Sequence, residues 1–167
     1  MASELGVQTI QHTNGTTAAT IDSSGRMKVG GNKIAWFAER SGDQTGYNGT
    51  AGNADPVIYN DVQYNYGSGY SGTTGEFTAP VKGIYMFHAG AWSNGINMLQ
   101  LWPLVNDARK RSIIIQGDQQ YASGSGLIEL ESGDTLGIKA YSNNSSTTIK
   151  ANEYHTFFKG ALIMAYE

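Results

Sequence analysis

Histidine, serine and cysteine are the residues that most often carry metal or nucleophilic chemistry, and their spacing in this sequence supports neither. His12, His88 and His155 lie far apart, without the i, i+4 spacing that brings two imidazoles onto one helix face around zinc. The chain has no cysteine, which excludes thiolate ligands and disulfides. The string Gly124-Ser125-Gly126 precedes an expected strand and lacks the strand-to-helix turn of a serine nucleophile. We therefore expect no catalytic residues, no metal ligands, no cofactor and no enzyme activity.

The acidic and glycine-rich segments also lack the arrangement that sugar hydrolysis or phosphate binding needs. Glu129 and Glu131 lie on one face of an expected strand beside a turn, whereas a glycosidase needs two carboxyls that face a sugar cleft. Glycine strings such as 67–69 stand between aromatic residues, with no following helix whose N-terminus would bind phosphate. The aspartate and asparagine residues do not have the spacing of a calcium loop, so the sequence selects no calcium site.

Two segments could contact a partner through exposed side chains. Arg109, Lys110 and Arg111 fall at the tip of an expected hairpin. There they form either a solvated turn or a contact with an anionic neighbour, such as lipopolysaccharide phosphate or an acidic capsid patch. Trp92 stands at a strand end beside a loop, where it either packs in the core or an interface or stacks on a sugar or a partner. The sequence leaves these alternatives open.

Length and charge exclude several classes of partner. A chain of 167 residues can bury a core of its own, so it needs no disulfide or metal to fold. Its formal net charge of -3 provides no basic surface for nucleic acid. The N-terminal segment lacks the basic start and apolar run of a secretory signal, and no segment approaches the roughly 20 apolar residues of a membrane span. We expect neither nucleic-acid binding nor membrane insertion.

The elements that must position these residues are strands, because short apolar and aromatic runs alternate with glycine and proline turns. The strands expected in residues 31–167 are 33–40, 57–59, 84–88, 98–105, 112–116, 126–130, 135–141 and 156–166. A polar, glycine-rich loop is expected at 41–54, and Pro103 favours an edge position or a bulge. About eight to ten strands at this spacing predict an all-β, antiparallel jelly-roll sandwich.

Two of these strands are apolar on both faces, although a sandwich strand that faces water on one side needs only one apolar face. In the strand 84–88, Tyr85 and Phe87 point to one face and their neighbours to the other, because side chains alternate. The strand 156–166 alternates in the same way around Leu162. Another copy of the chain is the simplest cover for the second face. The residues predicted to face that copy are Ile84, Met86, His88, Ile163 and Ala165. The histidine among them is expected to be structural and to tune assembly near neutral pH.

Residues 1–30 differ from the rest of the chain, because they are small and polar with few apolar side chains. Two short strands joined by a turn at 12–15 fit this pattern. The apolar residues, Leu5, Val7, Ile10, Ile21 and Met27, are too few to close a core. We therefore expect this segment to bind another surface and to attach the head, residues 31–167, to a partner.

Seven residues stand at a fixed spacing in the middle of the chain: Tyr59, Asn65, Tyr70, Phe77, Gly83, Tyr85 and Phe87. This spacing resembles the signature of the globular heads of complement recognition proteins, which belong with the tumour-necrosis-factor-like jelly rolls. The segment 130–136 resembles the family's late hairpin. The C-terminal strand resembles its closing strand at Phe158, Gly160 and Leu162. The resemblance covers residues 34–166 and implies a trimer. Tyr59 stands where the family usually has phenylalanine, and Ala89 where it usually has a further aromatic residue.

The N-terminal segment carries a second resemblance. Residues 7–15 and 20–27 are similar to repeated phrases in virion proteins of tailed bacteriophages, where they precede heads of this kind. This resemblance implies a place on the outer surface of a capsid or tail, with the major capsid protein or a tail protein as partner. It also accounts for the missing secretory signal, since virion proteins are released by lysis.

Two functions follow from these expectations. The first is capsid decoration, in which a non-enzymatic homotrimer acts as a cement protein that stabilises the shell. The alternative is the receptor-binding tip of a tail fibre, which recognises a host surface glycan or protein. The short segment before the head favours decoration, because a fibre normally needs a shaft. A cellular lectin or cytokine-like ligand is disfavoured by the lack of a signal and of cysteine.

Overall fold

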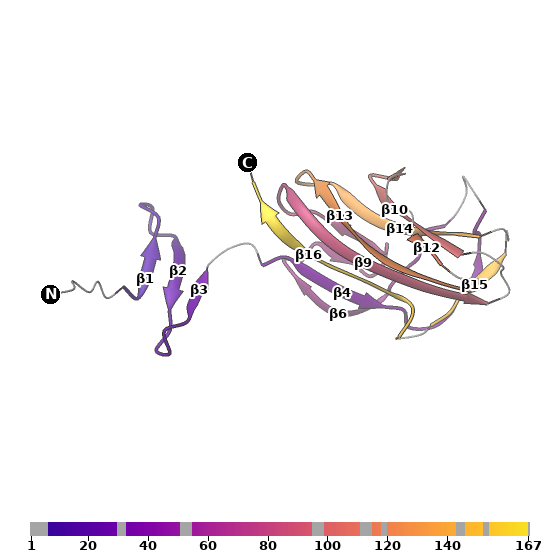
Figure 1. The fold of residues 1–167 in the computed structure, drawn as a ribbon, viewed down its shortest axis with the longest axis horizontal. Coiled ribbons are helices and arrows are strands. Elements are labelled where there is room, and N and C mark those ends of the chain that lie inside the picture. Colours follow the sequence, from indigo (N-terminus) through magenta and orange to yellow (C-terminus); the bar gives the residue numbers. More distant parts are fainter. Residues whose placement is uncertain are drawn as a thin grey trace. The chain divides into compact units, whose positions relative to one another are not determined.

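The structure is a computed structural model that describes residues 7–29, 33–50, 55–94, 99–110, 115–117, 120–142, 146–151 and 154–166. The chain forms two compact units, Met1–Lys33 and Ile34–Glu167, and both consist of antiparallel strands (Figure 1). The described residues form no helix that is long and apolar enough to cross a membrane.

The N-terminal unit is a three-stranded antiparallel sheet. Its strands are β1 (Thr9–Gln11), β2 (Thr17–Ile21) and β3 (Met27–Val29), in that order across the sheet. In the first turn Asn14 Oδ1 accepts the Thr16 N–H at 3.0 Å. In the second turn Asp22 Oδ1 accepts the N–H groups of Ser24 and Arg26, both at 3.0 Å. The predicted first hairpin is confirmed. The third strand was not predicted, because three residues are too few to show a period.

The head is a sandwich of two antiparallel sheets (Figure 1). The β10 sheet has the order β11-β10-β14-β8-β7, with β12 also paired to β10. Its strands are β7 (Tyr70–Ser71), β8 (Glu76–Thr78), β10 (Leu99–Val105), β11 (Ala108–Arg109), β12 (Ile115–Gln116) and β14 (Thr135–Ser142). The β9 sheet has the order β5-β15-β9-β16-β4-β6, with β13 also paired to β9. Its strands are β4 (Ala35–Glu39), β5 (Gln44–Tyr47), β6 (Asp61–Tyr66), β9 (Gly83–Asn94), β13 (Tyr121–Leu130), β15 (Thr147–Ile149) and β16 (Phe157–Ala165). The predicted all-β sandwich is confirmed.

The core between the two sheets is built around aromatic side chains. Trp36 on β4 stacks on Phe77 on β8, with ring centroids 3.9 Å apart, and Phe158 on β16 packs edge-on against Trp36 at 5.4 Å. All three side chains are fully buried. Gly160 makes room for them, because a Cβ atom at this position would lie 2.4 Å from Trp36 Cη2. The glycine of the closing strand is therefore required by the packing of the core.

Several of the expected segments differ from the structure. The strand expected at 126–130 begins at Tyr121, so the string 124–126 lies within β13 and not before it. Residues 57–59 do not form a strand: Val57 N–H donates to the Ile138 carbonyl at 2.9 Å, and Pro56 forms a single bridge with Lys139. The expected loop 41–54 contains β5, although its residues 51–54 lie outside the described residues. Tyr47 fixes β5, because its buried hydroxyl accepts the Ala140 N–H at 2.8 Å. That partner is distant along the chain, so local composition does not reveal the strand.

Pro103 lies neither at an edge nor in a bulge, contrary to the prediction. It pairs with Ile138 inside β10, which has neighbours on both sides. The Pro103 carbonyl accepts the Lys110 N–H at 3.0 Å, so this side of the residue faces β11 and not β14. On that side β11 pairs with residues 104–105 and β12 with residues 100–101. The missing N–H of proline therefore lies on the side of the short strand β11 and leaves the hydrogen bonds between β10 and β14 intact.

The C-terminal strand β16 is central, as expected, because it pairs with β9 on one side and with β4 on the other. Its alternation is interrupted by a register shift between Leu162 and Met164. A β-bulge of this kind places one extra residue opposite the partner strand. The side chains after the bulge therefore point to the face opposite to the one that simple alternation predicts. Met164 therefore pairs with Ile84, and the next residue, Ala165, pairs with Gly83.

Candidate functional site

The face of the β9 sheet that points away from the core, called here the outer face, carries side chains in rows across five strands. The strand pairing places one row along Tyr66, Ala35, Ala161, Met86 and Leu127. It places the next row along Tyr64, Phe37, Lys159, His88 and Ser125. Side chains in directly opposed pairs lie about 5 Å apart, so each row forms a continuous strip. Nine of these ten positions are uncharged.

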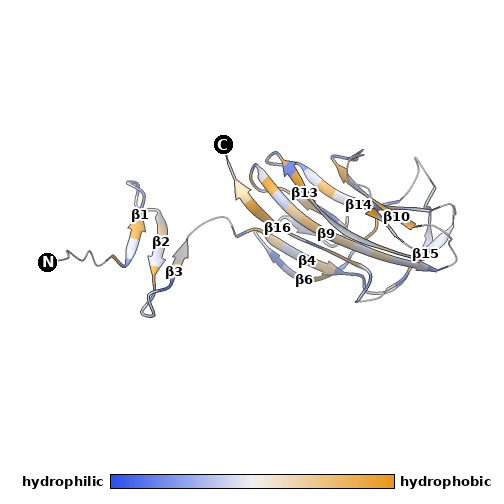
Figure 2. Cartoon of the chain, in the orientation of Figure 1, coloured by the Kyte–Doolittle hydropathy of each residue, from blue (hydrophilic) through white to orange (hydrophobic). Residues whose placement is uncertain are grey.

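Large apolar side chains on the outer face are exposed. Leu127 is 62% exposed, Tyr66 61% and Met86 48%. The alternate residues of β9, Tyr85 and Phe87, are fully buried in the core. Figure 2 shows hydrophobic residues along both β9 and β16. The prediction that β9 is apolar on both faces is therefore confirmed, and the outer side lacks a cover among the described residues.

A shallow groove of about 300 Å³ runs through the middle of the outer face. Its walls include Tyr64 on β6, Met86 and His88 on β9, and Lys159 and Ala161 on β16. Apolar atoms form most of these walls, so the groove could receive apolar side chains from a second protein surface.

His88 has its hydrogen-bonding capacity partly satisfied within the sheet. His88 Nε2 and Ser123 Oγ share a hydrogen bond of 2.9 Å, and the imidazole packs edge-on against Phe157 at 4.9 Å. Burial is the main cause that lowers the pKa of His88, and the positive charge of Lys159 lowers it further. Burial and the neighbouring charge thus both favour the neutral imidazole, and the structural role of His88 stays a prediction.

The predicted contact residues do not all share the outer face. Ile84, Met86 and His88 do, as the alternation of β9 requires. Ile163 lies at the bulge of β16 and is 56% exposed. Ala165 was assigned to the wrong face, because the bulge makes it the partner of Gly83, which lies on the same face of β9 as the core residues Tyr85 and Phe87. Met164, 51% exposed and paired with Ile84, occupies the outer face instead.

The N-terminal sheet presents an apolar face of its own. Ile10 pairs with Ala19 and Ile21 pairs with Met27, so these four residues share one face, while Thr9 and Thr20 form a pair on the other. Ile10 is 46% exposed and Met27 is 59% exposed. Of the remaining predicted attachment residues, Val7 precedes β1 and is half-buried, and Leu5 lies outside the described residues. Three of the five predicted residues therefore lie together on one sheet face.

A model of the C1q domain matches residues 35–163, which is most of the chain. The chain belongs to the C1q domain family.

Known proteins show the same similarity. Protein HP-25 homolog 1 of Bos taurus is 27% identical over 124 residues, which cover 67% of this chain and 52% of that protein. The chain thus spans about half the length of this curated relative. The globular domain of zebrafish complement 1qA protein has a TM-score of 0.60 and 21% identity, and the match covers 80% of this chain and 99% of that one. Eiger TNF from S. frugiperda has a TM-score of 0.60 and 10% identity, covering 82% and 96%. These similarities confirm the predicted jelly roll.

The residues that resemble the C1q signature have structural roles in this head. Asn65 bonds twice to the backbone of Tyr70: its Nδ2 donates to the Tyr70 carbonyl at 2.8 Å, and its Oδ1 accepts the Tyr70 N–H at 3.0 Å. The Tyr70 hydroxyl donates to the Tyr59 carbonyl at 2.8 Å. The Tyr85 hydroxyl donates to the Val81 carbonyl at 2.7 Å. The signature therefore fixes the turn before β7 and the entry into β9.

The candidate surface contacts lie on different sheets of the C1q head. Trp92, on β9, is half-buried, and its indole lies edge-on to His155 at 6.4 Å. Arg109 lies on β11 in the β10 sheet, and its guanidinium carbon is 3.4 Å from the centroid of the Trp102 ring. Lys110 follows it and is half-buried, whereas Arg111 lies outside the described residues. Trp92 and Arg109 therefore do not form one site.

Sequence reasoning missed the environment of Arg109. Trp102 is stacked between Arg109 and Tyr141, whose ring is 4.7 Å away at an angle of 15°. The cation–π contact orders a side chain that was expected either in a solvated turn or in contact with an anionic neighbour. The pairing of β10 with β14 brings Tyr141 to this position, so no local signal could have shown it. In the parts of the chain that the structure describes, no group of three or more His, Asp or Glu residues could hold a metal ion.

Proposed function

We propose that this protein is a non-enzymatic, homotrimeric structural protein of a bacteriophage virion surface. Its C1q head self-associates through the outer face of the β9 sheet, and its N-terminal sheet binds the virion. The favoured role is capsid decoration, in which the trimer acts as a cement protein on the shell. The observation that carries the proposal is that each unit has an exposed apolar face.

The outer face supports self-association on energetic grounds. Fully burying a leucine or methionine side chain contributes about 1.5–3 kcal/mol, and Met86, Leu127 and Met164 are each about half exposed or more in the isolated head. An exposed apolar patch of this kind typically marks an interaction site. The resemblance to the complement heads implies three copies rather than two.

Charge substitutions on the outer face test self-association. We expect the unmodified protein to be a trimer by sedimentation equilibrium, and Met86→Lys and Leu127→Lys to give monomers, because each places an ammonium group in the buried contact. Thr78→Lys is the matched control, since Thr78 is exposed on β8 in the other sheet. A stable monomer of the unmodified protein would refute the assignment of this face.

The N-terminal sheet supports the attachment role because it cannot form a core alone. Ala19 is the one buried apolar residue among those described in this unit, and the strands are three to five residues long. A small sheet needs a further surface against its apolar side for stability. The virion setting rests on the resemblance of residues 7–15 and 20–27 to bacteriophage virion proteins. The major capsid protein or a tail protein would supply the surface.

Substitutions on the two faces of the N-terminal sheet test attachment. We expect the double change Ile10→Asp and Met27→Asp to abolish binding to particles that lack the protein, because two carboxylates would have to be buried. Thr9→Asp is the control on the opposite face and should bind normally. Cosedimentation with particles measures both. Equal binding by the double variant would exclude this face as the anchor.

Copy number separates capsid decoration from the alternative, the receptor-binding tip of a tail fibre. Decoration requires a number of copies per virion comparable with that of the major capsid protein. A fibre tip requires only the few copies that the tail can carry. Quantitative mass spectrometry of purified virions gives this number directly, and a small number would move the proposal to the tail and to a host surface glycan or protein.

A further inference from the structure

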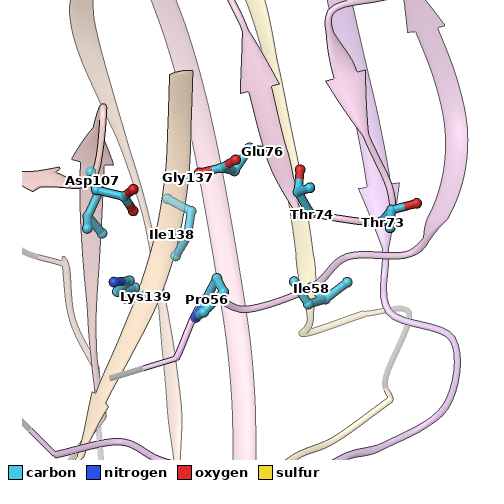
Figure 3. A pocket seen from close by; sticks show the side chains of 10 residues that line it. Pro56, Ile58, Thr73, Thr74, Glu76, Asp107, Gly137, Ile138 and Lys139 are labelled. Atoms are coloured by element: carbon cyan, nitrogen blue, oxygen red, sulfur yellow. The ribbon is translucent and has the colours of Figure 1, made fainter. Parts of the chain in front are cut away.

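The C1q head contains a second hollow on the β10 sheet, in the sheet opposite the self-association face (Figure 3). Its volume of about 350 Å³ lies near the lower end of the range of roughly 300–1,000 Å³ for ligand sites. The walls come from five places: the segment before β6, β8 with the turn that precedes it, the end of β10, the turn between β10 and β11, and β14. This volume suits a ligand the size of a monosaccharide.

Three charged side chains line the hollow. Glu76 lies on β8, Asp107 on the β10–β11 turn and Lys139 on β14. Within the described part of the chain, none of the three side chains forms a hydrogen bond or an ion pair. Glu76 and Lys139 are half-buried, and charged groups that are withdrawn from water usually have a partner. Two carboxylates and one ammonium group are therefore available to a ligand.

The walls that carry these groups are fixed before any ligand binds. The turn of Asp107 is held by its neighbour Asn106, whose Nδ2 donates to Asp134 Oδ1 at 2.7 Å and whose Oδ1 accepts the Thr135 N–H at 2.9 Å. Both residues of the turn have positive φ, 50° for Asn106 and 62° for Asp107, as a two-residue hairpin turn requires. The bonds of Asn106 to the start of β14 thus hold Asp107 at the rim of the hollow.

The opposite wall is fixed by Gln44 of β5. Its Nε2 donates to the Pro56 carbonyl at 2.9 Å, and its Oε1 accepts the Ile58 N–H at 3.1 Å. Gly75 lets this segment lie against the turn before β8, because a Cβ atom at Gly75 would be 2.5 Å from the Val57 carbonyl oxygen. Pre-organised walls lower the entropic cost of binding a ligand.

The floor is left open by a glycine. A Cβ atom at Gly137 would lie 3.3 Å from Glu76 Cγ, so any larger side chain there would occupy the space beside the carboxylate. Gly137 has no positive φ that would demand glycine, and it lies inside β14 where larger residues are ordinary. Glycine at this position therefore keeps the hollow open, and the backbone conformation does not require it.

We propose that the hollow binds a monosaccharide-sized ligand that carries an ammonium group beside hydroxyl groups, as an amino sugar does. Carboxylates outnumber the ammonium group, so the field at the site favours a cation over an anion. Glu76 and Asp107 accept hydrogen bonds from the ligand ammonium, while Lys139 and the Thr74 hydroxyl donate to ligand hydroxyl oxygens. The apolar surface of Pro56 and neighbouring side chains contacts the carbon atoms of the ring.

This site is independent of the proposed virion role. It lies on the β10 sheet, so it remains open when the outer face of the β9 sheet is covered. Binding can be measured on the full chain whether or not the trimer or the virion attachment proves correct. Failure of the ligand proposal would therefore leave the function proposal untouched, and the reverse also holds.

Titration of the full-length protein with D-glucosamine, followed by backbone amide NMR, tests the proposal. We expect shifts confined to residues 57–58, 73–76, 107 and 137–139, and binding by D-glucose at least about tenfold weaker, because it lacks the ammonium group. Glu76→Gln and Asp107→Asn should each raise the Kd about tenfold, since each removes a charge-assisted hydrogen bond. Asp61→Asn, at an exposed carboxylate on β6, is the control and should leave the Kd unchanged.

A steric variant tests the site without changing its charge. Gly137→Val fills the floor and should abolish binding while the amide spectrum keeps its native dispersion, because a β-branched residue is well suited to a strand. The proposal is overturned if glucosamine causes no shifts, if the shifts lie elsewhere on the head, or if glucose binds equally well. A Kd unchanged by both carboxamide variants also overturns it.

Discussion

At Tyr59 the head buries a hydroxyl group that has no hydrogen-bond partner among the described residues. The ring is fully enclosed, and burial raises the pKa of this phenol well above its ordinary value of 10.0. A buried polar group without a partner costs about 1–3 kcal/mol. The neighbouring Tyr70 hydroxyl is satisfied, since it donates to the Tyr59 carbonyl. The position where related heads usually carry phenylalanine is thus one where phenylalanine fits better.

Tyr59→Phe is therefore expected to raise the free energy of unfolding by about 1 kcal/mol, because it removes an unsatisfied hydroxyl and leaves the ring in place. Tyr70→Phe is the matched variant and should lower the free energy of unfolding by about 1 kcal/mol, since it leaves the Tyr59 carbonyl without its donor. Urea unfolding measures the free energy of unfolding of both variants and of the unmodified protein. A destabilised Tyr59→Phe variant would mean that the hydroxyl has a partner after all.

His88 makes the stability of the head depend on pH. Its pKa is lowered from the ordinary value of 6.5 by burial and by Lys159, so the unfolded chain binds a proton at a higher pH than the folded head does. The slope of stability against pH is positive wherever the unfolded state binds more protons. Stability is therefore complete above about pH 6.5 and decreases as the pH falls below this value towards the lowered pKa.

We expect urea unfolding to show this decrease in the unmodified protein and a smaller one in His88→Gln, which keeps a polar side chain beside Ser123 but does not titrate. Lys159→Gln should move the NMR-measured pKa of His88 upward, because it removes the neighbouring positive charge. A His88 pKa above 6.5 in the folded protein would contradict the assignment of burial as its cause.

At the scale of the element, the sequence predicted what depends on local alternation and missed what depends on distant pairing. The two faces of β9 follow from the alternation of Tyr85 and Phe87 with their neighbours, and the structure agrees. The face of Ala165 does not follow, because the bulge at Ile163 arises from the pairing of β16 with β9. The strand β5 was missed for the same reason, since the contact of Tyr47 with β14 defines it.

The closing strand also depends on a single glycine. Gly160→Ala is expected to lower the free energy of unfolding by about 1–3 kcal/mol, because its methyl group would meet the indole of Trp36 at 2.4 Å and the Met86 carbonyl oxygen at 2.6 Å. Combining it with Trp36→Phe should cost less than the sum of the two single changes, since the smaller ring vacates the space. Thermal unfolding of the four proteins in this cycle measures the coupling. If the effects of the two changes simply add, the contact with the Met86 carbonyl oxygen, and not the contact with the indole, causes the loss of stability.

At the scale of the whole molecule, the two units use apolar surface in different ways. The head closes a large core of its own and has additional apolar residues on the outer face of the β9 sheet. The residues described in the N-terminal sheet close no comparable core, and the apolar residues Ile10 and Met27 remain exposed. The composition of residues 1–30 was enough to predict this contrast. It could not indicate the two hollows of the head, because each is lined by strands or turns that are distant in the sequence.

Removal of residues 1–33 tests whether the head is independent of the N-terminal sheet. The buried residues of the head core all belong to Ile34–Glu167, so the shortened protein is expected to unfold at the same temperature as the head of the full chain. Because the proposed contact surface lies on β9 and its neighbours, it should also remain a trimer by sedimentation equilibrium. Calorimetry compares the unfolding temperatures of the shortened and full-length proteins, and sedimentation equilibrium compares their oligomeric states. A shortened protein that is monomeric but equally stable would assign self-association to the N-terminal sheet, and the apolar outer face of the head would then need a different occupant.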